Sequence, residues 1–254
     1  MGQERIIHAA LLGAGTVGSG VYKLVKDLEE EIISKTGARL VVDKILVRDT
    51  TKAREGIPSE LLIDRWDEIL NDPQIEIVIE VMGGIRPALT WLEEALRAGK
   101  QVVTANKDLL AEYGEQLFDA AEAGKCDLHF EAAVAGAIPI IRPLRQSLVA
   151  SELTEVMGIV NGTTNYILTR MTEDGMGYEE ALALATKLGY AESDPTADVE
   201  GYDAGRKVAI MASIAFNSNV TFSQVYTEGI THITAEDIRY AKEFGYVIKL
   251  IGMT

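Results

Sequence analysis

A buried strand, a glycine-rich turn and an amphipathic helix follow one another near the start of the chain. Residues 6–12 are apolar, and the pattern G-x-G-x-x-G follows at once in Gly13, Ala14, Gly15, Thr16, Val17 and Gly18. Between a strand and a helix, here expected through residue 32, this pattern is typical of a dinucleotide-binding unit. Gly13 allows the tight turn, Gly15 lets backbone approach a pyrophosphate, and Gly18 permits close packing of the helix on the strand. A glycine turn in another kind of parallel sheet is the alternative.

The alternation of strands and helices continues through the first half of the chain. Hydrophobic patterning predicts strands over 39–47, 76–81, 101–104 and 127–131, and helices over 87–98 and 107–123. This order is typical of an α/β domain with a doubly wound parallel sheet of the Rossmann type, which we assign to residues 1–138.

Ligands of such a sheet bind beyond the carboxyl ends of its strands. Five residues follow predicted strands and are therefore candidates for contact with a nicotinamide and a substrate: Gly83, Gly84, Thr104, Asn106 and Lys107. Lys107 carries the one charge among them, and a solvent-facing lysine at a helix start is the alternative interpretation.

The end of the second predicted strand bears on cofactor preference. The residues there are Arg48 and Asp49. An arginine can hold the 2′-phosphate of NADP, whereas an acidic residue can bind the ribose hydroxyls of NAD. The sequence favours NADP, with NAD as the alternative.

A second domain is expected over residues 139–254. Its start is a small-residue turn, EAAVAGAIPII, that enters a helix, and a predicted strand over 153–160 leads into Asn-Gly-Thr-Thr-Asn at 161–165. That segment suits a helix cap or a small polar ligand. A helix over 178–188 follows, so we expect an α+β domain.

An acidic segment over residues 189–207 ends in paired bases. Asp203 and Lys207 stand four residues apart and would share one face of a helix. Gly201 and Gly205 keep that helix thin where something comes close. A solvated acidic loop with a single ion pair is the alternative.

Composition excludes several classes of function. A formal charge of −15 argues against nucleic acid or an anionic membrane as the main partner. One cysteine, Cys126, excludes a disulfide framework, and His8, His129 and His232 lack metal-ligand spacing. No apolar run is long enough to span a membrane, and residues 1–5 are too short and polar for a secretion signal, so we expect a soluble cytoplasmic protein.

Taken together, the motifs resemble the homoserine dehydrogenase family along essentially the whole chain. They are GAGTVGSG, EVMGG, TANKDL, FEAAVAGAIPI, GIVNGTTNYIL, GYAESDPTADVEGYDAGRK and KLIG. The resemblance implies reversible reduction of L-aspartate 4-semialdehyde to L-homoserine with NAD(P)H, on the route to threonine, isoleucine and methionine.

The resemblance also implies roles for individual residues. Lys207 matches the proton donor, Asp203 the residue that binds substrate and orients this lysine, and Lys107 a second active-site lysine that contacts cofactor. The implied substrate-binding residues are Glu192, for the amino group, with Asp203, Asp198 and Thr163. The implied cofactor-binding residues are Gly13, Ala14, Gly15, Thr16, Val17, Gly18, Arg48, Gly83, Thr104, Lys107 and Gly189. A sodium-like monovalent cation would be held by backbone carbonyls of Glu131, Val134, Gly136 and Ile138.

Three rival functions are the alternatives to this resemblance. A phosphorylating semialdehyde dehydrogenase needs a nucleophilic cysteine, and Cys126 precedes a predicted buried strand. A 2-hydroxyacid dehydrogenase would use a histidine, and none of the three is expected at a strand end. Family members continue past KLIG and would form homodimers or larger homo-oligomers at full length. The third rival is therefore a truncated dinucleotide-binding sensor or an inactive fragment.

Overall fold

The computed structural model describes residues 5–254, so residues 1–4, on which the argument against a secretion signal mainly rests, lie outside the described part. The chain divides into two compact units, one extending through Ala133 and the other covering Val134–Thr254. From the sequence we place the boundary between the two functional domains after residue 138, and that boundary stays a prediction.

The first unit is built on a six-stranded parallel sheet, which confirms the expected α/β fold of the Rossmann type. The strand order is β3-β2-β1-β4-β5-β6. The strands are β1 Arg5–Leu12, β2 Ala38–Leu46, β3 Leu62–Ile63, β4 Ile75–Glu80, β5 Gln101–Thr104 and β6 Leu128–His129. Chain order reverses between β1 and β4, which neighbour each other in parallel. This switch point is where such sheets bind ligands.

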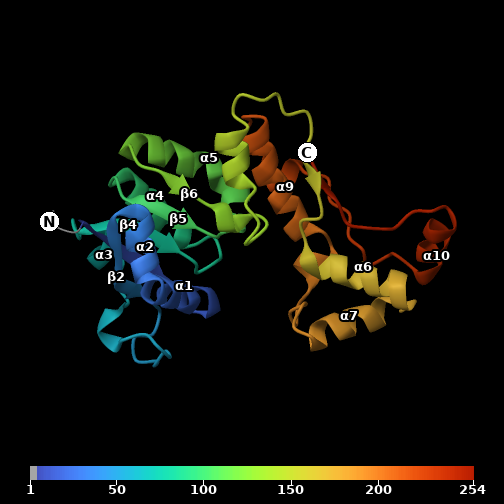
Figure 1. The fold of residues 1–254 in the computed structure, drawn as a ribbon, viewed down its shortest axis with the longest axis horizontal. Coiled ribbons are helices and arrows are strands. Elements are labelled where there is room, and N and C mark those ends of the chain that lie inside the picture. The colour runs from blue at the N-terminus through green and yellow to red at the C-terminus, as the bar shows by residue number, and fades with distance from the viewer. Residues whose placement is uncertain (1–4) are drawn as a thin grey trace. The chain divides into compact units, whose positions relative to one another are not determined.

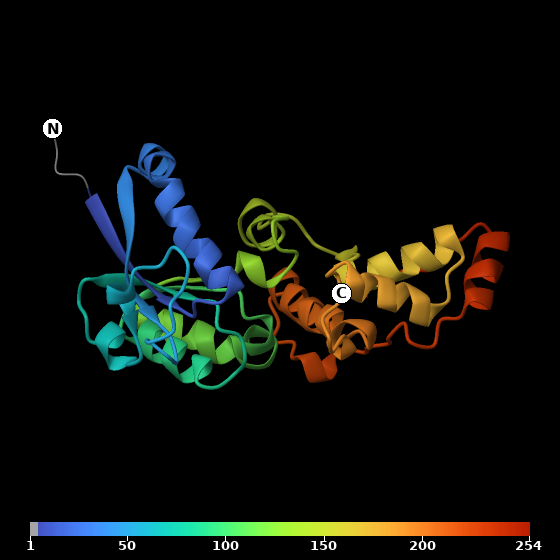
Figure 2. The same ribbon diagram turned by 90° about the horizontal axis from the view of Figure 1, so that it is seen from below.

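Helices cover both faces of this sheet, as Figures 1 and 2 show. They are α1 Thr16–Asp27, α2 Glu29–Thr36, α3 Asp67–Leu70, α4 Ala88–Arg97 and α5 Lys107–Gly124, with the short 3-10 helices η1 Ser59–Leu61 and η2 Glu131–Ala133. One core cluster buries Leu11, Val42 and Ile45 of the sheet against Val21 and Val25 of α1.

Two expected elements of the first unit differ in the structure. The helix expected through residue 32 is interrupted at Leu28, whose φ of −106° leaves the helical range. Three glutamates, Glu29, Glu30 and Glu31, fill the first turn of α2, where the helix dipole favours negative charge. The strand expected over 127–131 is only two residues long, because the chain turns into η2 at Glu131.

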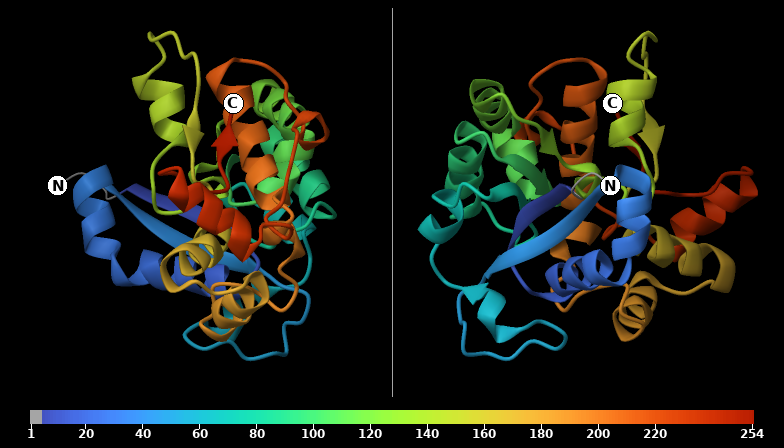
Figure 3. Two further views of the ribbon diagram at one scale, coloured as in Figure 1. Left: turned by 90° about the vertical axis from the view of Figure 1, so that its right-hand side faces the viewer. Right: turned by 60° about the vertical axis from the view of Figure 1, so that its left-hand side comes forward.

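The second unit is mainly helical. Its elements are η3 Pro143–Ser147, β7 Met157–Gly158, α6 Gly162–Asp174, α7 Tyr178–Lys187, α8 Thr196–Val199, α9 Tyr202–Ala215, η4 Phe222–Gln224, α10 Ala235–Glu243 and β8 Gly252–Met253. Helices α6 and α7 lie side by side in Figures 1 and 3, and Ile167, Leu168 and Met171 of α6 are buried in their shared core.

The strand expected over 153–160 is wrong for most of its length. Only Met157 and Gly158 are assigned to β7, because their partner β8 is itself two residues long. One further pair of backbone hydrogen bonds joins Val156 to Thr254. The expected cap at Asn161 is confirmed, since its side chain accepts the backbone N–H of Thr164 at the start of α6.

Among residues 5–254, no helix combines the length and apolar character that crossing a bilayer requires.

Candidate functional site

The glycine-rich turn of the first unit has the geometry expected of a phosphate cradle. Gly13 has a φ of +99°, and a side chain at Gly18 would bring its Cβ within 2.1 Å of the Gly13 carbonyl oxygen. Gly15 is the N-cap residue of α1 and has no side chain to cover the helix end. Nothing lies within 4 Å of where a Cβ on Gly15 would be. Gly15, Thr16 and Val17 are exposed. The N-terminus of α1 therefore has open space beside bare backbone, which fits a pyrophosphate.

Arg48 and Asp49 lie beyond the end of β2, and both are exposed. The Asp49 carboxylate accepts hydrogen bonds from the Thr51 hydroxyl, at 2.6 Å, and the Thr51 backbone N–H, at 2.9 Å. These bonds stabilise the charged form and lower the pKa of Asp49 below its ordinary value. Asp49 is thus held in a local turn beside Arg48.

A buried carboxylate that we did not predict joins the ends of β4 and β5. Glu80 is 0% exposed and accepts a hydrogen bond from the Thr104 hydroxyl at 2.5 Å. Gly83 and Gly84, two of the predicted strand-end residues, both have positive φ. Lys107 is half-buried as the first residue of α5, and Asn106 caps that helix by accepting the backbone N–H of Leu109.

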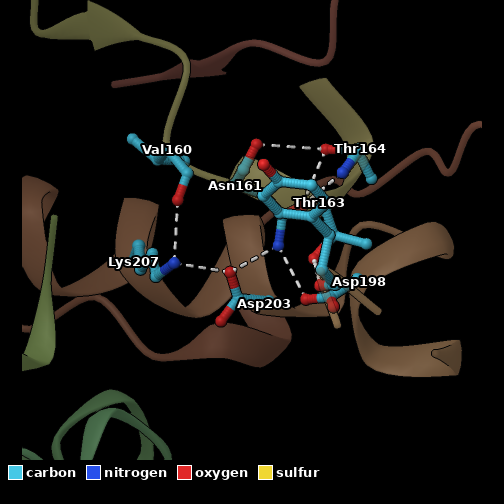
Figure 4. A network of polar contacts seen from close by, with 8 residues as sticks. Val160, Asn161, Thr163, Thr164, Asp198, Asp203 and Lys207 are labelled. Atoms are coloured by element: carbon cyan, nitrogen blue, oxygen red, sulfur yellow. Dashed lines mark hydrogen bonds and ion pairs between the residues drawn. The ribbon is translucent and has the colours of Figure 1, made fainter. Parts of the chain in front are cut away.

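In the second unit, Lys207 and Asp203 form a largely buried ion pair. The ammonium nitrogen of Lys207 lies 2.6 Å from Oδ2 of Asp203, and the two side chains are 16% and 7% exposed. The same ammonium donates to the carbonyl oxygen of Val160 at 2.7 Å. Figure 4 shows this arrangement, in which two acceptors fix the direction of the lysine side chain.

The amide of Asn161 connects this ion pair to a second acid. Its Nδ2 donates to Asp203 at 2.9 Å and to Asp198 at 2.7 Å. Its Oδ1 accepts the backbone N–H and the hydroxyl of Thr164, both at 2.8 Å. Asn161 is 4% exposed, so a buried neutral amide bridges two carboxylates (Figure 4). Sequence reasoning placed Asn161 in a polar turn but missed this bridge.

The other predicted substrate residues lie around this cluster. The Thr163 hydroxyl donates to the carbonyl oxygen of Tyr190 at 2.8 Å, which brings the loop after α7 to the start of α6. Gly189 begins that loop with a φ of +80°, and Glu192 follows on it with an exposed side chain. The ring of Tyr190 stacks on Tyr166 of α6, with centroids 4.5 Å apart.

Gly201 and Gly205 allow a close approach, as expected, and the approaching group belongs to the chain itself. A Cβ on Gly205 would lie 2.4 Å from a methyl carbon of Thr227. One on Gly201 would lie 2.9 Å from the carbonyl oxygen of Glu228. These glycines therefore serve packing of residues 222–228 on α9.

The segment of the expected cation site is strained. Ala135 and Ala137 have positive φ values of 50° and 67°, which non-glycine residues rarely adopt. Val134 is fully buried and Ile138 is 67% exposed. Within residues 5–254 no group of three or more His, Cys, Asp or Glu side chains could hold a metal ion.

Cys126 and His129 bear on the rival functions. Cys126 donates to the carbonyl oxygen of Leu96, and burial raises the pKa of its thiol, which disfavours a nucleophilic thiolate. The expectation that no histidine ends a strand is wrong, because the short strand β6 ends at His129. His129 is exposed.

Two family models match most of the chain. The model described as "Homoserine dehydrogenase, NAD binding domain" matches residues 13–131. The model described as "Homoserine dehydrogenase" matches residues 139–254.

Individual relatives agree with these models. The homoserine dehydrogenase of Bacillus subtilis is 48% identical over 250 residues, which are 98% of this chain and 58% of that protein. A crystal structure of a homoserine dehydrogenase from Thiobacillus denitrificans has a TM-score of 0.92 at 45% identity, and the chain covers 58% of it. A crystal structure from Archaeoglobus fulgidus, assigned to the same enzyme, has a TM-score of 0.85 at 34% identity, covering 98% of this chain and 80% of that one.

Proposed function

Because the chain belongs to the homoserine dehydrogenase family, we propose that the protein reduces L-aspartate 4-semialdehyde reversibly to L-homoserine with a reduced nicotinamide dinucleotide. The observation that carries this proposal within the second unit is the buried ion pair of Lys207 and Asp203. A family member with this activity would serve the synthesis of threonine, methionine and isoleucine.

Lys207 is proposed as the general acid. When hydride reaches the aldehyde carbon, the carbonyl oxygen becomes an alkoxide, which takes one proton to give the alcohol. A lysine ammonium within hydrogen-bond reach supplies that proton. Asp203 keeps the ammonium charged and, with the carbonyl of Val160, aims it. In the reverse direction the neutral amine accepts the proton from the hydroxyl.

The substrate is an amino acid, so its ammonium and carboxylate both need partners. Glu192 is proposed to bind the ammonium, with Asp198 adding negative charge nearby. Thr163 is proposed to help bind the carboxylate at the start of α6, where the helix dipole favours an anionic group. Tyr190 supports both proposals, because its carbonyl ties the loop of Glu192 to Thr163.

The cofactor, when bound, supplies the hydride. The glycine cradle fits its pyrophosphate, since Gly15 offers bare backbone at the N-terminus of α1. Further contacts are proposed for Ala14, Thr16, Val17, Arg48, Gly83, Thr104, Lys107 and Gly189. The exposed guanidinium of Arg48 supports a preference for NADP.

A monovalent cation is proposed at the start of the second unit. Val134, Gly136 and Ile138 alternate with the strained residues Ala135 and Ala137, and such strain persists where a function requires it. Backbone carbonyls, with that of Glu131, are suitable ligands for a hard cation.

Self-association to a homodimer or larger homo-oligomer is also proposed for the protein. Met157, Ile159 and Met253, on or beside the two-stranded sheet of β7 and β8, are exposed hydrophobic residues. Light scattering would report the mass in solution.

The test of the function compares two aldehydes. Succinate semialdehyde lacks the amino group of L-aspartate 4-semialdehyde. We expect the kcat/KM for NADPH oxidation to be on the order of 100-fold higher with the amino-acid aldehyde. Succinate semialdehyde would leave the carboxylates that bind the ammonium without a partner. Glu192→Gln should narrow this ratio, whereas Glu180→Gln, on an exposed face of α7, should not. Equal turnover of both aldehydes would contradict the proposed substrate.

A further inference from the structure

The carboxylate of Glu80, the last residue of β4, is fully buried and has no part in the reaction just described. Its Oε1 accepts the backbone N–H groups of Met82, at 2.8 Å, and Gly83, at 3.1 Å. Its Oε2 accepts the hydroxyl of Thr104 at 2.5 Å. A buried carboxylate is costly unless hydrogen bonds compensate its lost hydration. Two of these three donors lie in the turn after β4, and the third belongs to the last residue of the neighbouring strand β5.

Asn106 extends this network to the start of α5. Its backbone N–H donates to the Thr104 hydroxyl at 3.0 Å, and its Nδ2 donates to the carbonyl oxygen of Gly84 at 2.7 Å. Its Oδ1 caps α5 by accepting from Leu109. The turn after β4 is thus tied at both ends to the turn after β5.

The turn held in this way presents backbone to open space. Gly83 and Gly84 have φ values of +72° and +73°, both are exposed, and nothing lies within 4 Å of a Cβ on either. Two successive glycines lose much conformational entropy when they are ordered. Glu80 and Asn106 therefore hold a segment that would otherwise be mobile.

The position of this turn indicates which half of a dinucleotide it meets. The pyrophosphate belongs at the glycine cradle after β1, and the adenosine ribose belongs at the end of β2. In the sheet order, β4 and β5 lie on the other side of β1 from β2. The nicotinamide half therefore extends toward the turns after β4 and β5.

We propose that Glu80 is a positioning residue that, with Thr104 and Asn106, fixes the Met82–Gly84 turn as the surface on which the nicotinamide half of the cofactor rests. This inference rests on the proposed dinucleotide function. Thr104 is 1% exposed and its hydroxyl both donates to Glu80 and accepts from Asn106. The Thr104 side chain thus acts through the turn, so the cofactor contact proposed above for this residue would be made by its backbone.

The test compares NADPH with 2′-phospho-ADP-ribose, which lacks the nicotinamide ring. Glu80→Gln keeps the shape of the side chain but leaves only one acceptor oxygen, so either the N–H groups of the turn or the Thr104 hydroxyl loses its acceptor and the tie between the two strand ends is broken. We expect the Kd for NADPH to rise about tenfold and the Kd for 2′-phospho-ADP-ribose to stay unchanged.

Lys100→Met is the matched control. Lys100 is also buried and donates to the carbonyls of Asp72 and Ile75, at the opposite end of β5. It should lower the thermal midpoint without changing the ratio of the two Kd values. Thr104→Val should repeat the effect of Glu80→Gln, and Thr104→Ser should restore the wild-type ratio, which covers the case that Glu80→Gln does not fold.

An unchanged ratio in the folded Glu80→Gln or Thr104→Val variant would overturn the positioning role, as would an equal loss of affinity for both ligands. Failure of the wild-type protein to bind either ligand would instead overturn the proposed function, and the positioning role with it.

Discussion

The ammonium group of Lys207 lies 2.6 Å from the carboxylate of Asp203, one helical turn earlier on α9, and both groups are largely buried. Burial of an ion pair gains little stability, because the desolvation of two charges offsets their attraction. Asn161 and the carbonyl of Val160 hold the pair from a separate segment. The proposed role of Lys207 as a proton donor accounts for this arrangement, because a donor must be aimed at its acceptor.

Replacing each of the two acids bridged by Asn161 should separate the orientation of the Lys207 ammonium from the binding of the aldehyde substrate. Both Asp203 and Asp198 accept from its amide, but only Asp203 also contacts Lys207. We expect Asp203→Asn to lower kcat by about 100-fold, and Asp198→Asn to act mainly on the KM for the aldehyde. Steady-state kinetics check this. Equal effects on kcat would show that contact with Lys207 is not what matters.

Two substitutions in the glycine cradle should have different effects, one on dinucleotide affinity and the other on thermal stability. Gly15→Ala adds a methyl group where nothing lies within 4 Å, so the fold should keep its thermal midpoint while dinucleotide affinity falls about tenfold or more. Gly18→Ala forces a Cβ against the Gly13 carbonyl and should cost about 1 to 3 kcal/mol of stability. Calorimetry and fluorescence titration measure the two effects. A Gly15→Ala protein that binds normally would refute the cradle.

Arg48 should distinguish the two cofactors. Its exposed guanidinium follows β2, where the 2′-phosphate of NADP is expected. Arg48→Ala should raise the Kd for NADPH about tenfold and leave that for NADH unchanged. Arg97→Ala, which removes an exposed arginine from α4, is the control. Equal losses for NADPH and NADH would mean that Arg48 does not bind the 2′-phosphate.

The ion pair between Lys44 and Asp72 should make the stability of the folded protein depend on pH. The Lys44 ammonium, 2.8 Å away, is the main cause that lowers the pKa of Asp72 below its ordinary value of 3.8. A carboxyl group with a lowered pKa in the folded protein stabilises it above the unfolded pKa. That stability is lost as pH falls through the folded pKa.

Lys44→Met should therefore cost about 0.5 to 1 kcal/mol at neutral pH. Well below the unfolded pKa of Asp72 the difference from wild type should shrink to the part that comes from the hydrogen bond of Lys44 to the Glu68 carbonyl. Urea unfolding at a series of pH values measures it, with Lys23→Met as a control on an exposed face of α1. A difference that does not change with pH would exclude Asp72 as its source.

Local patterns predicted the parts of the site that are close in sequence. Gly13 and Gly18 belong to the same glycine-rich turn, and Asp203 and Lys207 are one helical turn apart. Their spacing in the sequence was therefore enough to indicate that the two members of each pair lie close together. Asn161 is 42 residues from Asp203, and only tertiary packing brings them together. Its sequence signal was a capping residue, and that part was confirmed.

Glu80 and the strand expected at 153–160 show two other limits of local patterns. In IEIVIE, the sequence of β4, a glutamate suggests an exposed position, whereas the turn after β4 and Thr104 of β5 supply the donors that let it be buried. Residues 153–156 have strand-like composition, but a strand also needs a partner, and β8 is short.

The proposed function depends above all on proton donation by Lys207 during reduction of the aldehyde. The most direct measurement is NADPH oxidation with L-aspartate 4-semialdehyde by the wild-type protein and by Lys207→Met, with Lys187→Met, on an exposed position of α7, as the control. We predict that Lys207→Met lowers kcat by a factor of about 100 to 10,000 while the Kd for NADPH stays unchanged, and that Lys187→Met behaves like wild type. A Lys207→Met protein that turns over at the wild-type rate would rule out Lys207 as the proton donor.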